Sequence, residues 1–239
     1  MIFRNILRSL LHLFAPPSCP VCGKILSRAE HFVCIDCHLS APLTNLWQSR
    51  DNVIEQRFWG QVPIVRAAAL WWFVEGSAWQ QVVHNFKYRS NWYYAENMGR
   101  WFGAEAADSG FFEDIDLIVP VPLHPLRRLE RGYNQAEHIA YGISTQTSIP
   151  YCFNAVRRTR NNPPQAQMRY SERWNNIEGL FAISNPERLT GRHILIVDDV
   201  FTSGATIISL AQAINTACNG DVKISVATIA ASRRLLENE

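Results

Sequence analysis

Four cysteines near the start of the chain stand as two Cys-x2-Cys pairs. Cys19 and Cys22 form the first pair, and Cys34 and Cys37 form the second after eleven intervening residues. Two such pairs can direct four thiolates tetrahedrally at about 2.3 Å from one Zn²⁺. Disulfides are the alternative, which a reducing compartment disfavours. The spacing predicts a structural zinc site, because four protein ligands leave no open position for water or substrate.

A second group of polar residues follows an apolar strand late in the chain, in the segment ILIVDDVFTSGAT, residues 194–206. The backbone N–H groups of its Thr-Ser-Gly turn and the dipole of a following helix favour an anion. The turn also carries three hydroxyl groups that can donate to phosphate oxygens, on Thr202, Ser203 and Thr206. Asp198 and Asp199 repel that phosphate, so they must face sugar hydroxyls or a divalent metal. An acidic helix N-cap is the plainer alternative, but it explains only one aspartate.

Arginine is the dominant basic residue of this chain. There are 20 arginines and three lysines, although the formal net charge is only +2. Eight arginines fall within residues 127–173 against three acids, which leaves a local excess of five positive charges. The planar guanidinium fork matches phosphate and carboxylate groups. This excess predicts an anionic ligand.

Two segments carry most of these arginines. The first, VPVPLHPLRRLERGYNQ at 119–135, follows an expected strand, so its loop should lie at the carboxyl edge of a sheet. A solvated basic turn is the alternative there. The second, residues 157–176, runs for about twenty residues without periodicity, and such a length inside a compact domain is usually functional or disordered.

The motif VDDVFTSGAT resembles the phosphoribosyl pyrophosphate (PRPP) motif of type I phosphoribosyltransferases. Together with the four cysteines and RGYNQ at 131–135, it narrows the resemblance to the competence-associated ComF family, which includes the GntX-like DNA-utilisation proteins. The resemblance runs from Pro17 to about Arg233. It implies an α/β type I phosphoribosyltransferase fold, a parallel sheet flanked by helices, preceded by a small zinc ribbon.

The resemblance also implies a role for each motif. It makes Asp198, Asp199 and Arg131 the catalytic residues, with the two aspartates on the ribose 2′- and 3′-hydroxyls. The 5′-phosphate loop would consist of Thr202, Ser203, Gly204, Ala205 and Thr206, and the pyrophosphate loop would include Arg127, Arg128 and Gly132. A flexible loop that closes over PRPP would include Arg158, Gln165 and Arg173. Asn162 departs from the more common Thr of the family, and Tyr133 from the more usual Phe.

The elements that must position these motifs follow from hydrophobic periodicity. Continuous apolar strands that alternate with helices predict a parallel sheet covered on both faces, and ligands of such sheets bind beyond the carboxyl ends of the strands. The expected strands are 65–74, 116–123, 151–158, 179–183, 193–200 and 222–231, and the expected helices are 77–88, 92–107, 132–144 and 204–218. The expected domains are 1–40 (amphipathic helix and zinc module), 41–62 (linker or packing arm) and 63–239 (phosphoribosyltransferase-like domain).

The first fourteen residues, MIFRNILRSLLHLF, predict an amphipathic helix rather than an export signal, because Arg4 and Arg8 interrupt the apolar run at helical spacing. This helix would dock on its own protein, or alternatively contact a membrane surface or a partner. No segment reaches the roughly 18 apolar residues of a membrane span. We therefore expect a cytoplasmic protein.

The predicted activity is a Mg²⁺-dependent phosphoribosyl transfer from PRPP to an unknown, base-like nitrogen acceptor, with release of pyrophosphate. It would serve DNA uptake and utilisation or nucleotide salvage, and Mg²⁺ would be held mainly by the substrate's phosphates. Glutamine-dependent amidophosphoribosyltransferase activity is not expected, because the chain begins Met1-Ile2 rather than with a cysteine nucleophile. The alternative is a non-catalytic competence factor that binds single-stranded DNA and contacts the uptake machinery, with the PRPP fold as sensor or relic.

Overall fold

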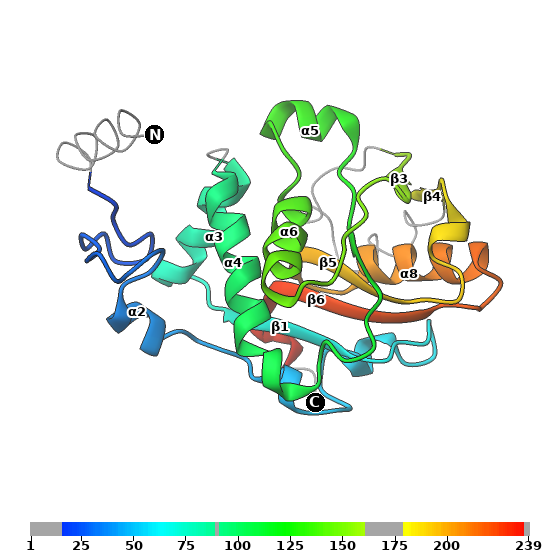
Figure 1. The fold of residues 1–239 in the computed structure, drawn as a ribbon, viewed down its shortest axis with the longest axis horizontal. Helices are drawn as coiled ribbons and strands as arrows, with labels where there is room; N and C mark the ends of the chain where they lie inside the picture. Colours follow the sequence, from blue (N-terminus) through cyan, green and yellow to red (C-terminus); the bar gives the residue numbers. More distant parts are fainter. Residues whose placement is uncertain (1–15, 89–90, 161–178, 237–239) are drawn as a thin grey trace.

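The computed structural model describes residues 16–88, 91–160 and 179–236, so the predicted N-terminal amphipathic helix lies outside the described residues. A four-stranded sheet forms the centre of the molecule, and the segment with the four cysteines lies to one side of it (Figure 1). Among the described residues, no helix is both long enough and apolar enough to span a membrane.

The central sheet has the strand order β1-β6-β5-β2, and all three neighbouring pairs are parallel. Its strands are β1 (Ala67–Phe73), β2 (Leu117–Pro120), β5 (His193–Phe201) and β6 (Lys223–Ser232). Because β5 and β6 both lie inside the sheet, most of their residues are buried. The parallel sheet predicted from the continuous apolar strands is confirmed.

Alternate residues of β5 face two different hydrophobic clusters. Leu195 and Val197 belong to the cluster that contains α4 (Trp92–Glu105) and α6 (Gln135–Thr147), whereas Ile194 and Ile196 belong to the cluster that contains α8 (Ala205–Ala217). This alternation is what helices on both faces of a sheet require. The helices are α2 (Ile35–Leu39), α3 (Ala78–Tyr88), α4 (Trp92–Glu105), α5 (Pro125–Arg131), α6 (Gln135–Thr147) and α8 (Ala205–Ala217).

The strand expected over 151–158 is wrong in length and in partner. Only β3 (Val156–Arg158) is a strand, and it pairs antiparallel with β4 (Phe181–Ile183) in a separate two-stranded sheet. Tyr151 makes one parallel bridge to Ile118 of β2, and the chain then leaves the central sheet. The sequence pattern cannot distinguish these partners, because a short apolar run fits either sheet.

The predicted packing arm, residues 41–62, contributes large side chains to the core. Its two 3-10 turns, η1 (Leu46–Gln48) and η2 (Glu55–Phe58), bury Trp47 and Phe58 at 1% exposure. Glu55 forms a buried ion pair with Arg66, with 3.4 Å between Oε1 and Nε. Three further 3-10 turns are η3 (Ala107–Ser109), η5 (Pro186–Arg188) and η6 (Arg233–Leu235).

Helices α4 and α6 pack so closely that glycines are required where they cross. A Cβ added at Gly99 would lie 2.1 Å from the carbonyl oxygen of Ile139, and one at Gly142 would lie 2.1 Å from the carbonyl oxygen of Glu96. Both clashes are with backbone, which cannot rotate away. The glycines thus fix the position of α6, whose first turn lies beside the candidate site.

We expect Gly142→Ala to destabilise the fold by about 1–3 kcal/mol, because overpacking forces the two helix backbones apart. The free energy of unfolding from urea titration measures this loss. Thr145→Ala, on the exposed side of the same helix, is the matched control and should change stability little. Equal stability of Gly142→Ala and the wild type would show that the helices do not need this close approach.

Candidate functional site

The two adjacent aspartates lie in the last part of β5, at the carboxyl edge of the sheet. The strand continues through Asp198 and Asp199 to Phe201, and Asp198 stands opposite Thr228 of β6. Both aspartates are partly exposed, and the backbone N–H of Asp199 donates to Oδ1 of Asp198 at 2.8 Å. The carboxylates therefore lie where ligands of parallel sheets bind.

The turn that follows β5 leads directly into the N-terminus of α8. Gly204 is the N-cap with φ of 79°, a left-handed conformation that favours glycine. A Cβ there would also lie 2.7 Å from Cζ of Phe201, so both backbone and space demand glycine. Thr202 is exposed, Ser203 is buried, and the N–H of Ala205 lies 3.5 Å from the Ser203 hydroxyl oxygen. This hydroxyl-bearing turn at the start of a thirteen-residue helix fits an anion.

The arginine segment after β2 is a short helix, α5, rather than the loop expected from the sequence. Pro125 occupies its first turn, and the ring nitrogen Nδ1 of His124 accepts from the N–H of Leu126 at 3.3 Å. Gly132 ends the helix with φ of 79°, and its N–H donates to the carbonyl of Arg128 at 2.8 Å. Proline first and glycine last is the usual order of helix ends. The predicted helix over 132–144 accordingly begins three residues later, at Gln135.

Asn134 ties this segment back to the sheet, although sequence analysis assigned it no role. Its side chain donates to the carbonyl of Val121 at 3.0 Å and accepts from the N–H of Ala136 at 3.2 Å. Asn134 is only 2% exposed, so these bonds hold the start of α6 against the end of β2. Asparagine just before a helix is a common N-cap, and that signal could have identified it.

Three arginines share one electrostatic environment with Asp198. Burial lowers the pKa of Arg158, the charges of Arg127 and Arg131 act in the same direction, and Asp198 opposes them. The guanidinium lies over the ring of Phe181, with 5.7 Å from Cζ to the ring centroid. Within the described residues, the buried Nε of Arg158 has no hydrogen-bond partner. The structure therefore brings Arg127, Arg131 and Asp198 within electrostatic range of Arg158.

The neighbouring side chains of α5 and α6 are already engaged. Nη1 of Arg131 donates to the Gln135 amide oxygen at 3.2 Å. Burial raises the pKa of the Tyr133 hydroxyl, and the negative charge of Asp199 raises it further. Tyr133 is thus a buried neutral side chain beside the acids.

Arg128 differs from the other arginines of its helix. Its guanidinium forms two hydrogen bonds with the Glu137 carboxylate, at 2.9 and 3.0 Å. Such a bidentate pair is stronger and more directional than a single contact. The structure therefore directs Arg128 towards α6. Of the predicted flexible loop, Gln165 and Arg173 lie outside the described residues.

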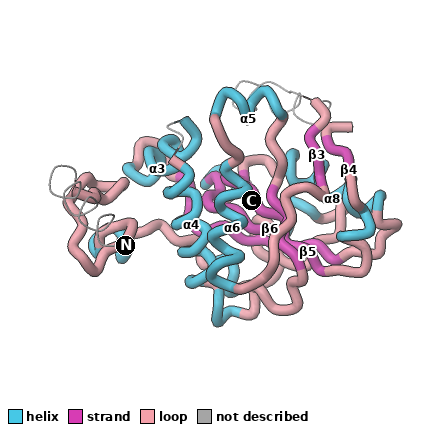
Figure 2. Tube along the Cα trace, turned by 45° about the horizontal axis from the view of Figure 1, so that its top comes forward, coloured by secondary structure: helices cyan, strands magenta, loops and turns pink. Residues whose placement is uncertain are grey.

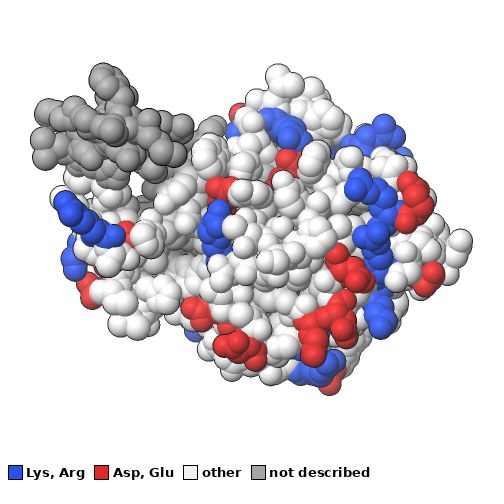
Figure 3. Space-filling view, in the orientation of Figure 1, with Lys and Arg blue, Asp and Glu red and all other residues white. Residues whose placement is uncertain are grey.

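Arginine and lysine side chains gather at the same end of the molecule. Both ribbon views place α5 and the β3–β4 pair at one end (Figures 1 and 2). Figure 3 shows Lys and Arg side chains over α5 and along the side that carries β3 and β4. Asp and Glu side chains stand among them, so this surface is rich in basic groups but mixed in charge.

The four cysteines form a second candidate centre with the geometry of a metal site. Their four Sγ atoms all lie within 4.8 Å of one another, and the Cys22 and Cys34 sulfurs are 3.6 Å apart. Tetrahedral zinc with Zn–S distances of about 2.3 Å requires sulfur separations of about 3.8 Å. All four cysteines are free thiols, so the predicted cysteine cluster is confirmed and disulfide pairing is not adopted. The donor set fits Zn²⁺.

Electrostatics within the cluster also fit a cation. Burial opposes ionisation of Cys19, but N–H groups of Cys34, Cys22 and Val21 outweigh it and lower the pKa of this thiol to about 7. Burial raises the pKa of the Cys37 thiol, and the neighbouring cysteines raise it further. Four thiolates this close repel one another, and a bound divalent cation would offset that repulsion.

The cysteine module packs against α4 through aromatic side chains. The ring of His38 stacks on Trp101 at 4.6 Å between centroids, and the ring of Phe32 meets Tyr94 edge-on at 5.3 Å. The hydroxyl of Tyr93 donates to the carbonyl of His31 at 3.0 Å. These contacts join the module to the helix that supports α6.

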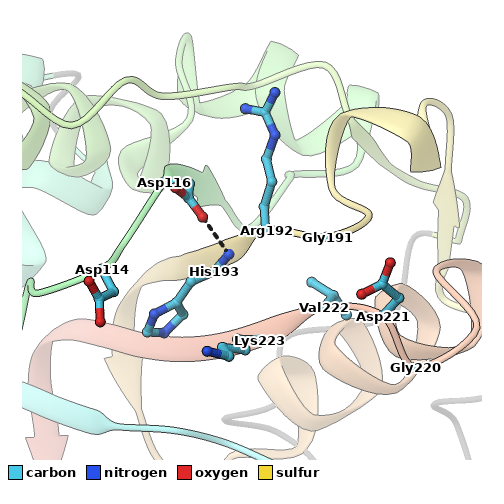
Figure 4. Close-up of a pocket in the computed structure, with 9 residues that line it drawn as sticks. All are labelled: Asp114, Asp116, Gly191, Arg192, His193, Gly220, Asp221, Val222 and Lys223. Atoms are coloured by element: carbon cyan, nitrogen blue, oxygen red, sulfur yellow. Dashed lines mark hydrogen bonds between the residues drawn. The ribbon is translucent and has the colours of Figure 1, made fainter.

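A pocket of about 450 Å³ lies at the opposite edge of the sheet, where β5 and β6 begin (Figure 4). Asp116 accepts from the backbone N–H of His193 at 2.8 Å, and Nε2 of His193 lies 2.9 Å from the hydroxyl of Ser225. These groups satisfy one another, and the amino ends of parallel strands are not where such sheets bind ligands. Despite its size, we assign no ligand to this pocket.

His193 predicts a pH dependence of stability. Burial, with the nearby Lys223 charge, lowers its pKa below the ordinary value of 6.5. The unfolded chain therefore takes up a proton first as the pH falls, so the free energy of unfolding should decrease below about pH 6.5. Urea unfolding at pH 8 and pH 5.5 measures this difference. It should shrink in His193→Gln, and an equal difference in both proteins would contradict the assignment.

Comparisons with known proteins show which families and proteins this chain resembles. Residues 129–238 match the family described as phosphoribosyl transferase domain. The chain is 26% identical over 135 residues to competence protein F of Haemophilus influenzae, a match that covers 55% of this chain and 59% of that protein. It is 36% identical over 97 residues to the DNA utilization protein YhgH of Escherichia coli strain K12, which covers 41% and 42%. The matches thus span about half the length of these two relatives.

A longer match joins the chain to the competence protein ComFC of Bacillus subtilis, with 25% identity over 206 residues that cover 84% of this chain and 72% of that protein. Among solved structures, the allosteric regulatory enzyme of purine biosynthesis matches with a TM-score of 0.38 and 18% identity, over 56% of this chain and 25% of that one. The glutamine PRPP amidotransferase of B. subtilis, complexed with ADP and GMP, gives the same values.

Proposed function

We propose that this chain binds PRPP and transfers its phosphoribosyl group, because residues 129–238 match the phosphoribosyl transferase domain family and the chain is similar to competence protein F, YhgH and ComFC. Transfer would depend on Mg²⁺ and would join a nitrogen of a base-like acceptor to C1 of the sugar. We assign this activity to residues 63–239, with the zinc module in 1–40 and a packing arm in 41–62. A reducing cytoplasm suits four thiolate ligands.

One observation supports this proposal most directly. The partly exposed carboxylate of Asp198, which is next to Asp199 in β5, acts electrostatically on the guanidinium of Arg158, whose buried Nε has no partner within the described residues. A buried N–H without an acceptor costs free energy unless a ligand supplies one. A sugar phosphate with free hydroxyls fits this arrangement, because its phosphate can lie at the helix N-terminus while its hydroxyls donate to the two aspartates.

Each part of the substrate would contact a different element. The 5′-phosphate accepts hydrogen bonds from the turn 202–206 and the N-terminus of α8. The ribose hydroxyls donate to Asp198 and Asp199. As the acceptor nitrogen forms its bond to C1, the bond from C1 to the pyrophosphate oxygen breaks, and the electron pair leaves with pyrophosphate. Arg127, Arg131 and Arg158 stabilise the charge that develops there.

Mg²⁺ and Arg128 would have supporting roles in this reaction. The carboxylate oxygens of Asp198 and Asp199 fit Mg²⁺, which prefers hard oxygen ligands and substrate phosphates. When bound with PRPP, the ion supplies positive charge against the leaving pyrophosphate. Arg128 is paired with Glu137, so its part would be to hold α5 in position rather than to face the pyrophosphate.

Calorimetric titration with PRPP, with and without Mg²⁺, tests the proposal on the full chain. We expect saturable binding that requires Mg²⁺, followed by pyrophosphate release when an acceptor base is added. Candidate bases can be screened singly by a coupled pyrophosphate assay. Absence of binding at millimolar PRPP would overturn the proposal.

A second candidate function is association with single-stranded DNA without catalysis. It is favoured by the names of the relatives, which are competence and DNA utilization proteins, and by the arginine-rich end that carries α5, β3 and β4. Binding through phosphates weakens steeply with salt. If this function is correct, we therefore expect the affinity for an oligonucleotide to fall with rising salt. This fall in affinity should not depend on Mg²⁺ or PRPP.

A further inference from the structure

A second pocket, lined with aromatic rings, lies beside α5 and α6. It measures about 330 Å³, and seven residues from α4, α5, α6 and the segment 151–153 line it: Glu96, Arg128, Glu137, His138, Tyr141, Tyr151 and Phe153. Small-molecule sites begin at about 300 Å³. None of these seven residues is among those that we propose to contact PRPP, so the pocket is separate from the proposed PRPP site.

Three exposed rings form one wall of the pocket. Tyr141, Tyr151 and Phe153 are 40%, 37% and 58% exposed. Tyr141 and Tyr151 lie edge to face with 5.9 Å between centroids, and Tyr151 and Phe153 are tilted at 6.2 Å. Adjacent aromatic rings left open to water are unusual, and such clusters mark interaction sites. Their faces offer stacking surfaces for a planar ring.

The ring of His138, on α6, also lines the pocket. It lies between two other rings, with centroids 5.8 Å from Trp92 and 5.2 Å from Tyr133. Burial lowers the pKa of His138, although the charges of Glu96 and Glu137 oppose that shift. At neutral pH this ring is therefore uncharged and adds a further flat polar surface.

The charged groups that line the pocket favour one kind of polar group on its ligand. Arg128 is neutralised by Glu137, whose Oε1 also accepts from the Asn134 amide at 3.3 Å. The partly exposed carboxylate of Glu96 accepts no hydrogen bond from the described part of the chain, so it is available as an acceptor. The remaining charge is negative, which disfavours a phosphate inside the pocket and favours an N–H donor.

We propose that this pocket binds a nucleobase that carries an exocyclic amino group. The base stacks on the rings of Tyr151 and Phe153, as bases do on aromatic platforms of nucleic-acid-binding proteins. Its amino group donates to Glu96, as the amino group of cytosine donates to carboxylates elsewhere. Adenine, cytosine and guanine meet these requirements, whereas uracil and thymine lack the amino donor.

The base can come from a free nucleoside or from a single strand, and one experiment separates the two sources. The full chain is titrated with adenosine, cytidine and uridine, and in parallel with eight-residue oligomers of dA, dC and dT. Binding of the nucleosides identifies a free base as sufficient, and binding of oligomers alone identifies a strand. In either case the amino-bearing bases should bind at least about fivefold more tightly than uridine or dT oligomers.

Two substitutions test the proposed contacts. Phe153→Ala should weaken binding about tenfold by removing a stacking face, and Glu96→Gln should reduce the preference for amino-bearing bases. Trp59→Ala removes another exposed aromatic ring, 62% exposed and outside the pocket, and should have no effect. Glu96→Gln keeps the shape of its side chain, so its result does not depend on how the fold tolerates Phe153→Ala.

Titration of the same variants with PRPP separates this inference from the proposed function. PRPP affinity should equal that of the wild type in every variant, because none alters the aspartates or the turn 202–206. Failure of all nucleosides and oligomers to bind at millimolar concentration would overturn the inference whatever PRPP does. Binding that both pocket variants retain unchanged would overturn it equally.

Discussion

Replacing Asp198 and Asp199 together with asparagine is expected to abolish Mg²⁺-dependent PRPP binding and to lower turnover by about a hundredfold or more. The change removes two carboxylates that accept from ribose hydroxyls and attract the cation. It keeps the size of both side chains and an oxygen at the Asp198 Oδ1 position, which accepts from the N–H of Asp199 at 2.8 Å. The fold should therefore survive while the ligand contacts are lost.

Calorimetry with PRPP and a pyrophosphate-release assay measure the two losses separately. Asp221→Asn is a matched control, because this aspartate lies at the amino edge of the same sheet. If the double variant retained wild-type turnover, the two aspartates would not be the groups that hold the ribose. Oligonucleotide affinity that persists in the double variant would instead favour the DNA-binding candidate.

Cys34→Ser is expected to remove the bound zinc and to unfold the cysteine module. Cys34 is completely buried, and its sulfur lies 3.6 Å from that of Cys22. Structural zinc contributes on the order of 10 kcal/mol to the folding of small modules, so loss of one ligand has a large effect. Because His38 of the module stacks on Trp101, tryptophan fluorescence should change as well.

Metal content by atomic absorption and fluorescence emission provide the two measurements for this variant. We expect one zinc per chain in the wild type and a loss of most of it in Cys34→Ser. Cys152→Ser is the control, because Cys152 is buried outside the cluster and should keep the full zinc content. One zinc per chain in both variants, or disulfides in the wild-type protein, would contradict the assignment.

The sequence by itself determined the features that depend on neighbouring residues. The Cys-x2-Cys spacing brings the sulfurs of Cys19 and Cys22 together through a tight turn that ends at Gly23, whose φ is 76° and whose N–H donates to the carbonyl of Cys19, and those of Cys34 and Cys37 across the first turn of α2. The continuous apolar run of β5 required burial on both faces, which a parallel sheet provides. Asp198, Asp199 and the turn before α8 are adjacent in the chain, so a single strand–turn–helix unit positions all of them.

Only the tertiary structure decided which distant segments meet. Arg158 comes within electrostatic range of Asp198 on a strand, β3, that leaves the central sheet to pair with β4, and no local sequence pattern predicts that pairing. Arg127 and Arg128 are adjacent in sequence but have different surroundings, because the charge of Arg127 acts on Arg158 whereas the guanidinium of Arg128 pairs with Glu137. The aromatic pocket likewise joins residues from four segments. Local sequence patterns indicate secondary-structure propensity and the spacing of residues along the chain, whereas contacts between segments are set by the packing of the whole chain.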